Sequence, residues 1–148
     1  MPFFKNLAAT LPEAKRLVYS PVVNRGDGLA YALAFAAVEH AYPEYAPNFI
    51  EASFIGVQDH KLQLSDWAAL DRIGQAARLP RKLTETLLSA EASAKSQVNQ
   101  YTTMQSHMKI TNTPSVAVVG TYIVTPEFTS GDAEQFSRLV NALVSMTL

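Results

Sequence analysis

The chain has 148 residues, of which 48% are hydrophobic and 17% charged, a balance typical of one globular domain, or of one domain with an insertion, and too apolar for intrinsic disorder. Twelve basic and thirteen acidic side chains give a formal net charge of −1, so there is no basic excess that would indicate nucleic-acid binding. The sequence contains no cysteine, which excludes disulfides, thiol nucleophiles, cysteine-ligated zinc and iron–sulfur clusters.

Targeting signals are not evident in the sequence. The most apolar stretch, Leu29 to Val38, is too short to cross a bilayer, so we expect no membrane span. The first residues have no charged region leading into an apolar one, so we expect no signal peptide in this chain. The location would then be cytoplasmic if Met1 is the true start.

The N-terminal segment predicts one helix and one strand. Apolar residues at helical spacing indicate a helix over Pro2–Thr10, which Pro12 ends because the residue before a proline avoids helical angles. β-Branched and aromatic residues then indicate a strand over Lys15–Val23. Pro21 cannot donate a ladder hydrogen bond and so favours a sheet edge or a bulge for this strand.

The middle of the chain predicts a block of helices. After a turn at residues 24–28, Leu29–Tyr42 is a very apolar helix, and Ala90–Lys109 is a long polar helix with a thin apolar seam. Three shorter helices lie between them: one from Pro43 to Gly56, one capped by Ser65, and one with Pro80 in its first turn.

The C-terminal segment predicts a hairpin and a closing helix. Strands are expected over Ser115–Val119 and Tyr122–Thr125, joined by a tight turn at Gly120–Thr121. Asp132 followed by Gln135 is similar to a capping box, which would open an amphipathic terminal helix.

This order of elements, together with the segment from Ile110 to Pro126, resembles the DsbA-like thiol–disulfide oxidoreductases. Thr113-Pro114 matches the residue pair at the cis-proline of that family, and Gly120 to Tyr122 matches the hairpin turn that follows it. The resemblance implies an α/β fold with an incomplete thioredoxin-like sheet of about three strands. It assigns residues 1–25 and 110–148 to this sheet domain and residues 26–109 to an inserted helical domain.

One departure from the family bears directly on activity. Members carry a Cys-x-x-Cys pair at the start of the helix that corresponds to Pro2–Thr10, preceded by a central strand, and neither is present in this sequence. The chain is thus expected to be a fragment, or a degenerate homologue, of a thiol–disulfide oxidoreductase. Without a thiolate it should be redox-inactive, with no cofactor. The family itself is periplasmic.

A second function follows from the same resemblance: a non-catalytic module that binds an extended polypeptide or a protein. In the family, the residue before the cis-proline offers its backbone to an extended substrate, a form of strand addition. The corresponding binding residues here are Thr113, Pro114 and Asn112, where Asn112 replaces a common glycine, and His107 is a possible further contact. We expect Pro114 to be cis, since this isomer costs only about 0.5–1 kcal/mol before proline.

The absent central strand would lie between Lys15–Val23 and Ser115–Val119. The two flanking strands could pair directly, a second protomer could cover the gap, or Lys15–Val23 could leave the sheet. We expect a homo-oligomer, since exposed strand edges favour pairing. The histidines show no metal-binding spacing, so no metal site is expected, and His40 is expected to be a partly buried side chain.

Overall fold

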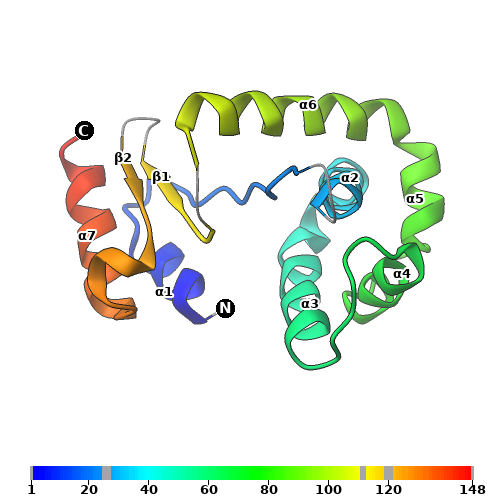
Figure 1. The fold of residues 1–148 in the computed structure, drawn as a ribbon, viewed down its shortest axis with the longest axis horizontal. Coiled ribbons are helices and arrows are strands. Elements are labelled where there is room, and N and C mark those ends of the chain that lie inside the picture. Colours follow the sequence, from blue (N-terminus) through cyan, green and yellow to red (C-terminus); the bar gives the residue numbers. More distant parts are fainter. Residues whose placement is uncertain (1, 25–27, 111–112, 119–121, 148) are drawn as a thin grey trace. The chain divides into compact units, whose positions relative to one another are not determined.

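A computed structural model describes residues 2–24, 28–110, 113–118 and 122–147. Helices dominate this part of the chain, as Figure 1 shows. The elements are α1 (Pro2–Thr10), α2 (Gly28–Ala41), η1 (Pro43–Tyr45), α3 (Ala46–Gln58), α4 (Trp67–Ala76), α5 (Leu83–Ser89), α6 (Glu91–Met108), β1 (Val116–Val118), β2 (Tyr122–Val124), η2 (Pro126–Thr129) and α7 (Ala133–Ser145).

The chain forms two units. Unit 1 comprises Met1–Tyr19 and Met104–Leu148, and unit 2 comprises Ser20–Thr103. The sequence-based division placed the corresponding boundaries after residues 25 and 109. Each unit has its own buried core.

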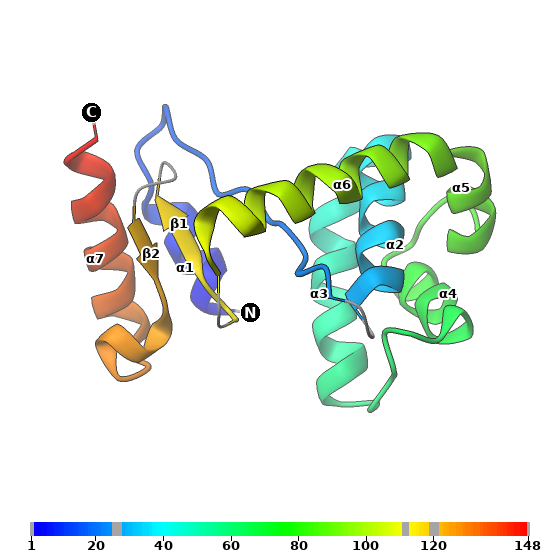
Figure 2. The ribbon, with the colours of Figure 1, turned by 45° about the horizontal axis from the view of Figure 1, so that its top comes forward.

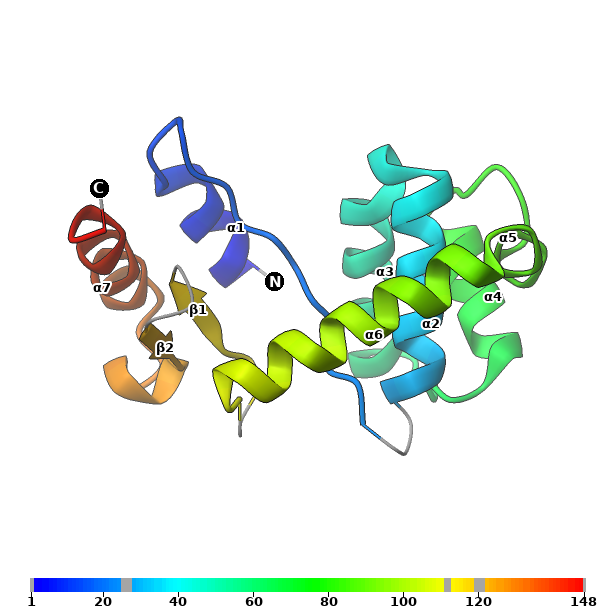
Figure 3. The same ribbon diagram turned by 90° about the horizontal axis from the view of Figure 1, so that it is seen from above.

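Unit 1 is built on the hairpin of β1 and β2. The strands are antiparallel, with Ala117 opposite Ile123. Helices α1 and α7 pack against each other, and Figure 3 shows both on one side of the hairpin. The buried core comprises Leu7, Val116, Val118, Val124, Phe136, Val140 and Val144.

The terminal helix begins where the sequence predicts. The Asp132 carboxylate accepts a hydrogen bond from the Gln135 amide at 2.8 Å, which satisfies one of the backbone donors left over at a helix start. Phe136, Val140 and Val144 then recur at intervals of four residues and form the buried stripe of α7. The predicted turn at Gly120–Thr121 lies outside the described residues.

The predicted fold class is wrong. Within the described residues the only sheet is the two-stranded hairpin, and Lys15–Val23 has no regular secondary structure. A strand needs a ladder partner, and no described segment supplies one between Lys15–Val23 and β1. Pro21 also removes a donor. Leu17 packs against the core of unit 1 while Val18 is 65% exposed, so this segment buries apolar surface without joining a sheet. The described chain is mostly helical, and an α/β thioredoxin-like sheet of three strands is not present.

Unit 2 is a cluster of helices around α2. Every residue from Ala34 to Val38 is buried, because α2 packs against α3, α4 and α5 (Figure 2). The ring of Tyr31 stacks on that of Phe49 with centroids 5.8 Å apart, and Phe35 contacts Tyr101 of α6.

Two helix starts in unit 2 differ from those predicted. Asp66, and not Ser65, caps α4 by accepting from the amide of Ala68. Helix α5 begins at Leu83, after the predicted start near Pro80, because the Asp71 carboxylate of α4 accepts hydrogen bonds from both the amide and the hydroxyl of Thr84.

Helices α3 and α4 have similar, though not identical, C-terminal ends. In each, a residue with positive φ follows the helix, Lys61 after α3 and Arg78 after α4. The next amide then returns to the helix, from Leu62 to the Gly56 carbonyl and from Leu79 to the Gly74 carbonyl, both at 3.0 Å. A side chain at such a left-handed position costs about 1–2 kcal/mol where glycine costs almost nothing.

Candidate functional site

The residues predicted to bind substrate lie just before β1 in unit 1. Thr113 and Pro114 are exposed, and the peptide bond between them is cis, as expected. Asn112 lies outside the described residues. His107 is exposed in the last turn of α6. Whether these residues contact a ligand stays a prediction.

Strand β1, which follows this loop, packs alternate side chains into the core of unit 1. Val116 and Val118 are buried and Ala117 is half-buried, whereas Tyr122 of β2 is 37% exposed. We call the edge of β1 that faces away from β2 its outer edge. Within the described residues no strand pairs with this outer edge.

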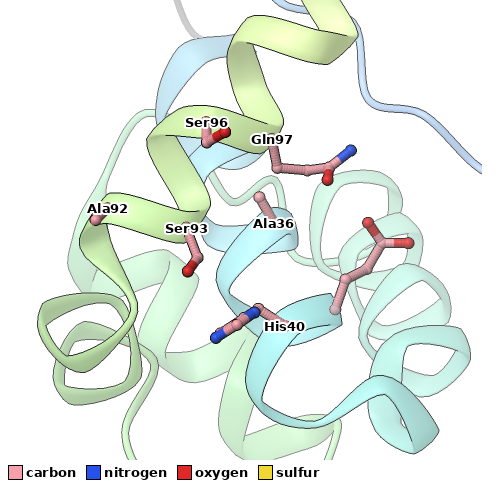
Figure 4. Close-up of a pocket in the computed structure, with 7 residues that line it drawn as sticks. Ala36, His40, Ala92, Ser93, Ser96 and Gln97 are labelled. Carbon is pink, nitrogen blue, oxygen red and sulfur yellow. The ribbon is translucent and has the colours of Figure 1, made fainter.

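A second candidate site is a groove in unit 2 between α2 and α6. It has a volume of about 560 Å³ and polar walls (Figure 4). His40 comes from α2, and Ser93 comes from the neighbouring α6. His40 is exposed, so the expectation of a partly buried side chain is wrong. The full lining is Ala36, Glu39, His40, Ala92, Ser93, Ser96 and Gln97.

Glu39, which lines the groove, accepts a long-range hydrogen bond. The hydroxyl of Tyr101, which is 4% exposed, donates to Glu39 Oε2 at 2.5 Å. Burial, followed by this hydrogen bond and the charge of Glu39, raises the pKa of Tyr101 far above its ordinary value. Tyr101 therefore stays protonated as a donor and does not serve as a base near neutral pH.

The groove lacks the arrangement that activates a serine. Among the described residues, neither Ser93 nor Ser96 hydrogen-bonds to His40. Acyl transfer by serine requires a nucleophile paired with a base. The described residues thus form a polar surface groove between α2 and α6.

The Glu39–Tyr101 pair was not apparent from the sequence. The two residues are 62 positions apart, and Tyr101 fitted the apolar seam of its helix. The available signal was chemical: a buried tyrosine hydroxyl usually has a hydrogen-bond partner. That signal indicates the need for an acceptor, but it does not identify which of several acidic residues provides it.

We expect replacement of Tyr101 by phenylalanine to change how stability depends on pH. The folded-state pKa of Tyr101 lies above its unfolded value near 10, so the unfolded chain releases this proton first as pH rises. The contribution of Tyr101 is therefore complete below pH 10 and is lost above it. Tyr101→Phe should flatten the loss of stability above pH 10 and lower the free energy of unfolding at pH 7 by about 1.5–3 kcal/mol.

Urea unfolding followed by circular dichroism at several pH values measures both effects. Glu39→Gln is the matched control, because the amide oxygen still accepts the hydrogen bond while the charge is removed. It should weaken the alkaline dependence less than Tyr101→Phe does. An identical alkaline slope in wild type and Tyr101→Phe would contradict the assignment.

The described residues contain no group of three or more histidine, aspartate or glutamate side chains that could hold a metal ion. None of the helices described is both long enough and apolar enough to cross a membrane. No family model, curated protein or solved structure matches this chain.

Proposed function

We propose that unit 1 is a binding module for extended polypeptide, which pairs as an additional strand with the outer edge of β1. One observation carries the proposal. The valines of β1 are buried, but within the described residues the backbone of β1 is hydrogen-bonded to another strand along one edge only. Unpaired backbone groups beside a packed core favour pairing with another chain.

β1 is a better acceptor than β2. Pro126 and η2 follow β2 after Thr125, and Tyr122 at the start of β2 is exposed. Both valines of β1 belong to the core of unit 1, so the position of this strand is set by packing. The accepting edge would be held rigid, which lowers the entropy cost of binding.

Thr113 and Pro114, the substrate-binding residues that the family resemblance implies, lie just before β1 and would contact the end of the added strand. The absence of cysteine supports a role without disulfide chemistry. A relationship to the DsbA-like oxidoreductases stays a proposal, supported by the order of helices, hairpin and terminal helix.

The test uses a ten-residue peptide of alternating valine and threonine with a lysine at each end. We expect binding to slow hydrogen exchange at those β1 amides that point toward the outer edge, while the outward amides of β2 are unchanged. The same peptide N-methylated at alternate residues is the control. Methylation removes donors on one edge and should weaken binding at least tenfold.

Equal binding of both peptides, or protection of β2 instead of β1, would contradict the proposal. A second copy of the chain is the other possible occupant of the edge. Concentration-dependent protection of β1 without peptide, together with a dimer mass in light scattering, would replace the peptide-binding function with self-association.

A further inference from the structure

A separate pocket in unit 2 lies between α3 and α4. Its volume is about 750 Å³, within the range of small-molecule sites in proteins. The apolar part of its wall comes from both helices and from the loop that joins them: Ala52, Ile55, Leu62, Ile73, Ala76 and Ala77.

Two arginines line the same pocket. Arg72 lies on α4 and Arg78 directly follows that helix. Neither guanidinium has a hydrogen bond or an ion pair within the described part of the chain. A guanidinium presents a planar set of donors that matches a carboxylate, and two of them beside an apolar wall favour an anion.

Polar side chains other than the arginines also line the pocket: Glu51 on α3, and His60 in the loop after that helix. The apolar wall suits a hydrocarbon chain attached to that anion.

The backbone of Arg78 has a matched counterpart outside the pocket. Its φ of 61° is a left-handed conformation in which glycine would be more stable. The same cap occurs at Lys61 after α3, which does not line the pocket. Lys61 thus provides a control for the backbone conformation of Arg78.

We propose that this pocket binds a carboxylate that carries an unbranched apolar chain. The carboxylate lies between Arg72 and Arg78, and the chain lies along the apolar wall toward Ile73. This site is independent of the strand-accepting edge in unit 1, since every residue that lines it belongs to unit 2.

The test is calorimetric titration of the full chain with sodium octanoate below its micellar concentration, with octanamide as the uncharged control. We expect octanoate to bind at least tenfold more tightly than octanamide. Arg72→Gln should weaken octanoate binding at least tenfold.

Arg78→Gly and Lys61→Gly form the decisive pair of variants. Both relieve the same left-handed conformation, so both should raise the urea midpoint of unfolding. Only Arg78→Gly should weaken octanoate binding, again at least tenfold. Equal affinity for octanoate and octanamide, or equal loss of binding in the two glycine variants, would overturn the proposal.

Discussion

Replacing Phe136 by alanine is expected to destabilise unit 1 by about 3–5 kcal/mol. Phe136 is fully buried, and its ring meets that of Phe4 edge to face at a centroid distance of 6.5 Å. It joins α7 to the cluster that contains both valines of β1. The alanine variant leaves a cavity in that cluster and removes the aromatic contact.

Hydrogen exchange of the α7 amides is the measurement, because it reports on unit 1 directly. The amides of Val140 and Val144 should exchange hundreds of times faster in Phe136→Ala. Phe136→Leu conserves most of the volume and should cost less than about 1.5 kcal/mol. A loss of less than 1 kcal/mol in the alanine variant would show that this side chain does not hold the core together.

Phe49→Ala is expected to have an effect of similar size in unit 2, about 3–5 kcal/mol. Phe49 is fully buried and stacks on Tyr31 at an interplanar angle of 10°. Its loss leaves a cavity beside α2, whose residues Ala34 to Val38 are all buried. The exchange of the α3 amides should accelerate, and Phe49→Leu again serves as the volume control.

If Phe49→Ala left the exchange of α3 unchanged, the helices of unit 2 would have to be stabilised elsewhere. The remaining candidates are the contacts of Leu70, Ile73 and Leu83, which are also fully or almost fully buried. The exchange rates of Phe49→Ala therefore show which side chains stabilise unit 2.

The sequence predicted those elements that depend on local signals. The apolar periodicity of α7 and the cap at Asp132 lie within a few residues of each other, and the helix is found where they indicate. The hairpin was also predicted, because two apolar runs flank a short glycine-containing segment.

The sequence did not predict features that depend on distant partners. Lys15–Val23 has the composition of a strand, but composition does not provide the neighbouring chain that a strand needs. Asp71 fixes the start of α5 from another helix, and Glu39 accepts from Tyr101 across 62 residues. These contacts exist only once the helices have packed.

The candidate sites were predictable only in part. The cis bond at Thr113–Pro114 was expected from a resemblance and is present. The pocket with Arg72 and Arg78 was not predicted, since neither arginine stands out in the sequence. Lys61 and Arg78 also end their helices without the glycine that usually marks such a position.

The division into two units has a practical consequence, because the only tryptophan of the chain, Trp67, begins α4 in unit 2. Indole emission thus reports the unfolding of unit 2, whereas far-ultraviolet ellipticity also includes the helices α1 and α7 of unit 1. Two melting curves recorded on one unlabelled sample would coincide if the units unfold together, and their separation would measure how independently each unfolds.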